Sequence, residues 1–279
     1  MKLASAILMV GLVAAMSWGA RAEESTQSAA PLATSQESNA REPVVVELFT
    51  SEGCSTCPPA DALLAVLDSR QPLPSAEVIA LEEHVDYWDQ QGWKDPFSSA
   101  DWTFRQNEYS SSLRNGSPYT PEMVVDGTAG FTGNRGASAK AAIEKAAAVK
   151  KAKVEIRELA PPQSKSLALK INIEKLLNAS AKDTPQVLLG ITETGLHSSV
   201  KDGENAGHEL QHSAVLRELK VIGVAGKNGQ DGFAAEPTVK LGSEWKMENL
   251  RAVVFVQEKK SRRVLGAAEL RLSQQEPLR

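Results

Sequence analysis

Cys54 and Cys57 are the only two cysteines of the chain, and their C-x-x-C spacing is a pattern that can carry redox chemistry. A cysteine at the start of a helix lies near unpaired N–H groups and the positive end of the helix dipole, which both favour the thiolate. Because the thiolate attacks disulfides, we expect the more exposed Cys54 to attack. Cys57, one turn further on and shielded by the helix, would then release the mixed disulfide.

Two other roles are open to such a pair. A structural disulfide between cysteines three residues apart closes a loop too short to stabilise a domain much. A closed zinc site needs four ligands, and the sequence holds no third cysteine. A non-enzymatic binding module, whose two thiolates bind a partner or a soft ion such as Cu(I), is the main alternative to an enzyme. We predict no organic cofactor and no resident metal.

The residues around the cysteines predict a strand, a polar turn and a helix. Residues 44–49 form a β-branched, apolar run that is typical of a buried strand. Pro58 and Pro59 suit the first turn of a helix, where a missing N–H costs nothing. Residues 78–81 predict a second strand, which should lie parallel to the first because a helix connects the two.

Residues 84–97 are the densest mixture of aromatic and charged side chains in the sequence. They follow the second predicted strand at the end where α/β proteins bind ligands. We therefore expect Tyr87 and Trp88 to face the substrate beside the cysteines. His84 and Asp86 would support the site, with His84 able to titrate near the thiol. A loop whose aromatic rings only cover the core is the structural alternative.

A proline-led hairpin follows. Pro121 fits the start of a strand, since proline cannot pair as a central strand residue, and Asp126–Gly127 is a strong hairpin signal. Helices are predicted on either side of this hairpin, over residues 98–114 and 137–151.

This order of elements resembles the thioredoxin fold. In that family a cis-proline faces the C-x-x-C motif and the backbone before it pairs with the substrate, so the resemblance assigns substrate binding to Thr120 and Pro121. Thioredoxins also place a buried acid in this region as a proton relay for the resolving cysteine. Glu47 is the nearest match, one residue out of register, and a solvent-facing glutamate is the alternative.

A closer resemblance rests on three segments, VVVELFTSEGCSTCPPADALL, HVDYWDQQGWKDPF and YTPEMVVDG. They are similar to a family of predicted secreted, thioredoxin-like bacterial proteins that carries only a domain-of-unknown-function label. The resemblance covers nearly the whole chain after residue 42 and implies fold and location without a substrate. Ser55 and Thr56 stand where well-known oxidoreductases have Gly-Pro or Pro-His, which leaves the direction of exchange open.

From Lys153 the sequence changes to alternating apolar runs with polar turns, which predict an all-β, sandwich-like domain. This part contains His208-Glu-Leu-Gln-His212, which matches the H-E-x-x-H motif of zinc proteases. That motif works only on a helix, whereas Gly203 and Gly207 precede it and a strand-like run follows. We expect a loop or strand here and keep a zinc hydrolase as a remote alternative.

The N-terminus predicts export. A charged start, an apolar run over residues 3–16 and Ala20-Arg21-Ala22 form a signal-peptide pattern over residues 1–22. Residues 23–42 lack bulky apolar side chains and should form a flexible leader. We therefore divide the mature chain into a thioredoxin-like domain (43–152) and a β-rich domain (153–279), located in the periplasm or secreted.

The charge of the chain restricts its partners. A formal net charge of −4 argues against nucleic acid or an anionic membrane as the partner. We expect no membrane contact after signal cleavage. The expected partners are a protein or small-molecule disulfide or thiol and an unidentified redox partner.

Overall fold

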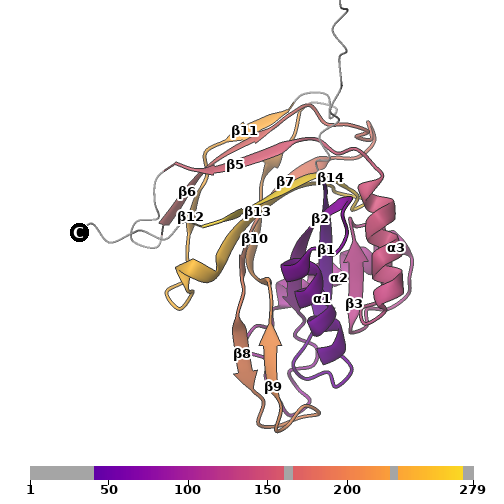
Figure 1. The fold of residues 1–279 in the computed structure, drawn as a ribbon, viewed down its shortest axis with the longest axis vertical. Helices are drawn as coiled ribbons and strands as arrows, with labels where there is room; N and C mark the ends of the chain where they lie inside the picture. The colour runs from indigo at the N-terminus through magenta and orange to yellow at the C-terminus, as the bar shows by residue number, and fades with distance from the viewer. Residues whose placement is uncertain (1–40, 160–165, 227–231, 273–279) are drawn as a thin grey trace, which may run out of the picture. The chain divides into compact units, whose positions relative to one another are not determined.

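The computed structural model describes residues 41–159, 166–226 and 232–272, and its centre is an eight-stranded mixed sheet (Figure 1). The strand order is β14-β13-β7-β10-β2-β1-β3-β4. The predicted signal peptide and nearly all of the predicted leader lie outside the described residues. Strand β1 begins at Glu42, one residue before the predicted domain start.

The first half of the chain builds one end of this sheet. Its elements are β1 (Glu42–Thr50), α1 (Pro58–Arg70), β2 (Ala76–His84), α2 (Ala100–Leu113), β3 (Glu122–Val125), β4 (Ala129–Thr132) and α3 (Gly136–Ala147). Strand β1 pairs parallel with β2 and antiparallel with β3, and β3 forms a hairpin with β4. The predicted strands, helices and hairpin of this region are therefore confirmed.

The two faces of this end of the sheet follow from side-chain alternation along β1. Val44, Val46 and Leu48 point to one face and form a core with α1 and α3. Phe49 points to the other face and packs with Tyr109 of α2. Each side chain of β1 is therefore assigned to one helix layer by its position in the strand.

The second half contributes ten strands among the described residues. They are β5 (Val154–Glu158), β6 (Ser166–Ile173), β7 (Pro185–Glu193), β8 (Leu196–Ser199), β9 (Glu209–His212), β10 (Val215–Val224), β11 (Phe233–Ala235), β12 (Thr238–Lys240), β13 (Leu250–Glu258) and β14 (Val264–Arg271), with a short 3-10 helix at Met247–Asn249 before β13. The predicted β-rich character is confirmed, although four of these strands extend the central sheet. The division predicted at residues 152 and 153 stays a prediction.

A smaller antiparallel sheet of β5, β6, β11 and β12 lies over this part of the central sheet (Figure 1). Leu167, Leu169, Ile171 and Ile173 alternate with more exposed residues along β6 and share a core with Val187 of β7. The period-2 pattern read from the sequence thus marks the buried side of this layer.

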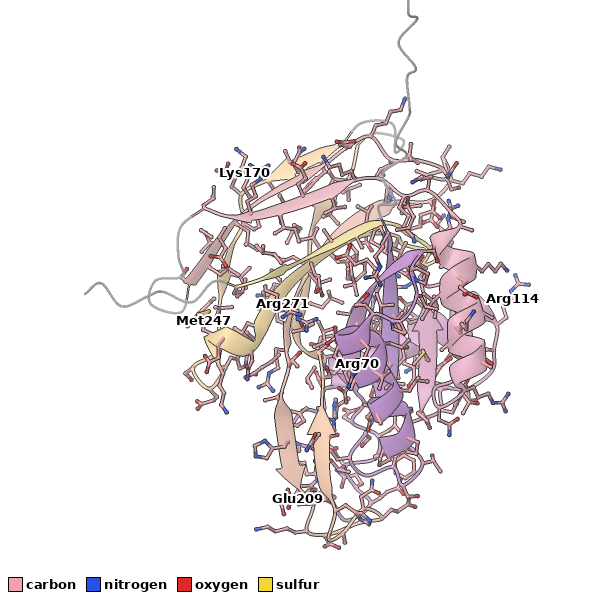
Figure 2. The ribbon with its side chains drawn as sticks, in the orientation of Figure 1. Arg70, Arg114, Lys170, Glu209, Met247 and Arg271 are labelled. Carbon is pink, nitrogen blue, oxygen red and sulfur yellow. A yellow bond between two sulfur atoms is a disulfide. The ribbon has the colours of Figure 1, made fainter. Side chains whose placement is uncertain are left out.

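The hairpin of β8 and β9 leaves the central sheet and packs against α1 (Figure 1). Glu209 marks the start of β9, toward the end of the hairpin that is remote from the sheet (Figure 2). Within the three described stretches of the chain, no helix is long and apolar enough to cross a membrane.

The β3–β4 turn generates a test of the fold. Gly127 has a φ of +68°, and a Cβ added there would lie 1.8 Å from the carbonyl oxygen of Arg262. We expect Gly127→Ala to lower the free energy of unfolding by about 2–5 kcal/mol, from left-handed backbone strain plus overpacking. Gly116→Ala is the matched control: its φ is +95° but its Cβ would meet nothing within 4 Å. The control should therefore lose only about 1–2 kcal/mol. Urea unfolding measures both, and equal losses would contradict the packing of this turn.

Candidate functional site

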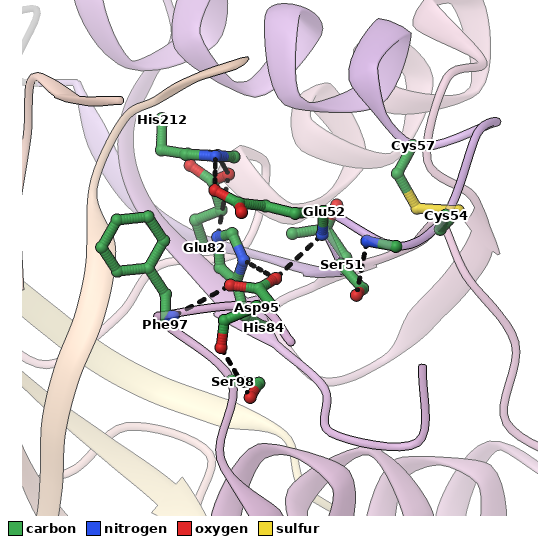
Figure 3. Close-up of polar contacts among 12 residues, drawn as sticks. Ser51, Glu52, Cys54, Cys57, Glu82, His84, Asp95, Phe97, Ser98 and His212 are labelled. Atoms are coloured by element: carbon green, nitrogen blue, oxygen red, sulfur yellow. Dashed lines mark hydrogen bonds and ion pairs between the residues drawn. A yellow bond between two sulfur atoms is a disulfide. The ribbon is translucent and has the colours of Figure 1, made fainter. Parts of the chain in front are cut away.

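The two cysteines form a disulfide at the N-terminus of α1 (Figure 3). Cys57 is the N-cap residue, and its carbonyl oxygen accepts the backbone N–H groups of Ala60 and Asp61. Cys54 and Cys57 are 1% and 0% exposed, so both cysteines are buried when they form the disulfide. The exposed part of the motif is Ser55 and Thr56 between them.

The connection between β8 and β9 covers the motif. The Asn205 side-chain amide donates to the carbonyl oxygens of Glu52 and Cys54, at 2.8 and 3.0 Å. The Ser55 N–H donates to the Glu204 carboxylate at 3.1 Å. Sequence reasoning missed both residues, because Asn205 lies 151 residues from Cys54 and no local pattern links the two.

Three of the predicted substrate residues lie beside the motif. The Trp88 indole N–H donates to the Thr120 hydroxyl at 2.8 Å, and a Cβ added at Gly53 would lie 3.1 Å from the Trp88 Cβ. Pro121 lies near the first turn of α1, with Gly133 between them. A Cβ added at Gly133 would be 3.2 Å from the Cβ atoms of both Ala60 and Pro121. The Thr120–Pro121 bond is cis, as expected.

Asp86 and Tyr87 come directly before Trp88, in the segment between β2 and α2. The Tyr87 hydroxyl donates to Gln106 of α2 at 3.1 Å, and burial raises the pKa of Tyr87 to about 12. Tyr87 is 37% exposed, so part of its side chain remains accessible to a ligand. Asp86 accepts a hydrogen bond from the Thr103 hydroxyl at 2.6 Å, which ties the loop to α2. Asp86 thus has a structural contact away from the cysteines.

Glu47 lies on the sheet face opposite α1. Its neighbour Leu48 faces α1, so Glu47 points toward α2, where it binds Arg105 at 2.6 Å and accepts from the Tyr109 hydroxyl. It is 0% exposed, which excludes the solvent-facing alternative. Burial acts to raise the pKa of Glu47, but the Arg105 guanidinium outweighs it and the pKa is lowered. The structure does not bring Glu47 together with the cysteines.

Asp61 lies on α1 one turn after Cys57. It is 6% exposed and accepts the Thr50 hydroxyl at 2.6 Å. Burial, together with the nearby charge of Glu82, raises the pKa of Asp61 to about 7. Asp61 is in the first turn of α1, where a negative charge is also favoured by the helix dipole. The structure shows a buried acid on the helix that carries the disulfide.

A buried group of histidines and carboxylates lies next to the C-x-x-C motif (Figure 3). His84 at the end of β2 binds Asp95 at 2.7 Å through Nδ1. His212 at the end of β9 contacts two carboxylates, Glu82 through Nδ1 at 2.7 Å and Glu52 through Nε2 at 3.0 Å. We call these five residues the buried His–carboxylate cluster. Glu52 lies two residues before Cys54, so the cluster and the disulfide share one turn.

The charges in this cluster stabilise one another. Burial disfavours charged imidazoles, but Asp95 raises the pKa of His84 well above its ordinary value, and Glu82 raises that of His212 to about 9. Burial likewise disfavours a charged Glu82, yet His212 lowers the pKa of Glu82 to about 2. In the protein as described, imidazolium and carboxylate groups therefore pair in the interior.

The H-E-x-x-H segment has no helix. His208 is exposed in the loop, and Glu209–His212 is strand β9, as expected. The two histidines thus do not share one helix face. His212 instead belongs to the buried His–carboxylate cluster, a role that the motif did not indicate.

These features define a mixed α/β protein with a C-x-x-C disulfide at a helix N-terminus. The chain belongs to the family described as Protein of unknown function (DUF1223), whose family model matches residues 45–257. This confirms the resemblance to a family of unknown function. The secreted and thioredoxin-like parts of that resemblance stay predictions.

Two solved structures are similar to this chain. The crystal structure of protein AGR_C_4864 from Agrobacterium tumefaciens aligns with a TM-score of 0.62 and 22% identity, over 86% of this chain and 98% of that chain. At this identity the likeness concerns the fold alone. Spo0M, a sporulation control protein from Bacillus subtilis, aligns with a TM-score of 0.25 and 12% identity over 44% of this chain and 49% of its own. No curated protein matches the sequence.

The Glu47–Arg105 pair predicts a pH-dependent stability. We expect Arg105→Met to lower the free energy of unfolding by about 3–5 kcal/mol at pH 7, because it leaves a buried carboxylate without its cation. The wild type loses the contribution of Glu47 as pH falls from the ordinary value of 4.5 through the lowered folded pKa. In the variant Glu47 protonates more readily, so the difference between the two proteins should shrink toward acid pH.

Glu47→Gln in the Arg105→Met background is the matched control for this prediction. It removes the buried charge and should recover part of the loss at pH 7. Urea unfolding at several pH values measures all three proteins. A difference that stays constant with pH would contradict the assignment of a charged Glu47.

Proposed function

We propose that this protein is an exported thiol–disulfide oxidoreductase with a thioredoxin-like core. The observation that carries the proposal is the Cys54–Cys57 disulfide at the N-terminus of α1. Pro121 lies near the first turn of the same helix, and Thr120 is bonded to Trp88, which lies beside the turn before Cys54. The sheet order β2-β1-β3-β4, with α1 and α3 on one face and α2 on the other, supports the thioredoxin-like assignment. The signal-peptide pattern supports delivery to a compartment where disulfides persist.

The proposed exchange has two steps. The Cys54 thiolate attacks one sulfur of a substrate disulfide, forming a mixed disulfide and releasing the other substrate sulfur as a thiolate. The Cys57 thiolate then attacks the Cys54 sulfur, which closes the protein disulfide and releases the second substrate thiolate. Two electrons pass from the protein dithiol to the substrate, and the reverse sequence oxidises a dithiol.

The surroundings supply a role for each further residue. Thr120 and Pro121 would hold the substrate backbone, and Trp88 fixes Thr120 through its indole N–H. Asp61 replaces Glu47 as the acid we propose for the proton of Cys57, since it lies on α1 and Glu47 does not. Because both cysteines are buried, the loop that carries Asn205 must move away from Cys54 before a protein substrate can react.

The cysteine roles predict an asymmetry. Cys57→Ser should accumulate mixed disulfides with substrates, because Cys54 can still attack but no thiol is within reach to release the product. Cys54→Ser should not, since the remaining thiol is enclosed at the N-cap of α1. Non-reducing electrophoresis of each variant, recovered from its native compartment, measures the complexes.

The same two variants, with their Cu(I) content measured as well, separate the oxidoreductase from the binding module and from a soft-metal site. Complexes only in Cys54→Ser would reverse the two roles. Complexes in neither variant would favour the binding module, and equal loss of Cu(I) in both would favour a soft-metal site. The double variant, with both cysteines changed to serine, is the control for complexes formed by other routes.

The proposed role of Asp61 predicts that its replacement slows the second step, in which Cys57 releases the mixed disulfide. We expect Asp61→Asn to leave the alkylation rate of reduced Cys54 near that of the wild type. It should slow release of a mixed disulfide by Cys57 about tenfold or more, because a general base is lost. Stopped-flow thiol release from a protein preloaded with a mixed disulfide on Cys54 measures this step. Equal slowing of both reactions would indicate a structural effect instead.

A further inference from the structure

We infer that Glu82, His84 and His212 bind one divalent transition metal ion of the zinc class, through Glu82 Oε1, His84 Nε2 and His212 Nδ1. One donor atom from each of the three residues lies within 4.8 Å of the others. Two imidazole nitrogens and one carboxylate oxygen form a ligand set that zinc and its neighbours in the first row accept. This metal site is independent of the thiol–disulfide exchange that we propose for Cys54 and Cys57.

Two of the three distances between the proposed ligand atoms fit a metal with little rearrangement, and the third, between the two imidazole nitrogens, is within 4.8 Å. Tetrahedral ligands about 2.1 Å from zinc lie about 3.3–3.4 Å apart. Glu82 Oε1 is already 3.3 Å from His84 Nε2 and 2.7 Å from His212 Nδ1. Binding would lengthen the second contact by roughly 0.6 Å, which replaces a hydrogen bond by two metal–ligand bonds.

His84 supplies an independent sign of a ligand. The residue is 0% exposed, and its Nε2 has no hydrogen-bond partner among the described residues. The contact of this nitrogen with Glu82 Oε1 is close in distance but lacks hydrogen-bond geometry. A buried polar atom without a hydrogen bond costs free energy, and a metal between the three side chains would give this nitrogen a bond.

Outer groups hold each proposed ligand in place, as they do in metal sites. His84 Nδ1 contacts Asp95 at 2.7 Å, and His212 Nε2 contacts Glu52 at 3.0 Å. The second oxygen of Glu82 accepts the Ser213 N–H at 2.8 Å. Both imidazoles thus have a carboxylate on the nitrogen that faces away from the proposed ion, which is the carboxylate–histidine–metal arrangement.

An approach from solvent exists at His212. This residue lines a surface pocket of about 370 Å³ between α1 and the β8–β9 hairpin, together with Ala65, Ser69 and residues 194–197. Glu82 and His84 are fully buried behind it. An ion would therefore enter beside β9, where His212 borders this pocket.

Zinc binding to the untagged, disulfide-bonded protein tests the inference, since the oxidised cysteines cannot act as ligands. Isothermal titration with Zn²⁺ alone should show one ion per chain. Glu82→Gln and His84→Gln should weaken binding about 100-fold or more, and Asp95→Asn about 10–100-fold. His208→Ala changes an exposed histidine outside the proposed ligand set and should bind within about twofold of the wild type.

Crystals of the wild type soaked in Zn²⁺ give a second measurement that needs no folded variant. An anomalous peak between Glu82, His84 and His212 would support the site. No binding by the wild type, or a peak at any other position only, would overturn it. Loss of binding in His208→Ala with retention in Glu82→Gln would also overturn it, in favour of the H-E-x-x-H segment.

Discussion

The buried carboxylate of Glu82 is the constraint on which the rest of the structure depends. Its backbone N–H donates to Ala214, next to the Val215–Glu82 pair that joins β2 to β10. A carboxylate that is 0% exposed requires compensation in place. His212 and the Ser213 N–H supply it, and both come from the second half of the chain. Glu82 therefore links the two halves of the chain twice, through the backbone pairing of β2 with β10 and through its buried carboxylate.

This junction fixes the position of the β8–β9 hairpin. Because His212 is tied to Glu82 and Glu52, the hairpin lies along α1 and its connecting loop reaches the cysteines. Asn205 then binds the carbonyl oxygen of Cys54. The second half of the chain thus contacts the backbone on both sides of Cys54. We propose that it selects partners through this loop, in addition to extending the sheet.

Local patterns were enough to predict the first half. The proline pair after Cys57, the β-branched strand before it and Asp126–Gly127 are short-range signals, and each element that they predicted is present. The strands of the second half followed from period-2 alternation for the same reason. Pairing between the halves could not be predicted, because no local pattern relates Val215 to Glu82.

The candidate site divides in the same way. Local sequence patterns mark the cysteines and Thr120–Pro121. Asn205 and His212 join the site through contacts with residues 151 and 130 positions away in the sequence, which no local pattern marks. The position of Glu47 in the first strand favours a role near the cysteines, but strand alternation turns its side chain away from α1. In the sequence His212 is marked only by the H-E-x-x-H motif, whereas its hydrogen-bond partners come from β2 and the turn before Cys54.

The redox equilibrium of the Cys54–Cys57 pair is the most direct test of the proposed function. Thiol trapping of the full-length protein under defined ratios of reduced to oxidised glutathione gives the fraction of disulfide at each ratio. A working pair should titrate reversibly as one two-electron couple, between about −120 and −270 mV. A disulfide that stays closed at every ratio, with a potential below about −300 mV, would mark a structural bond and contradict the oxidoreductase assignment.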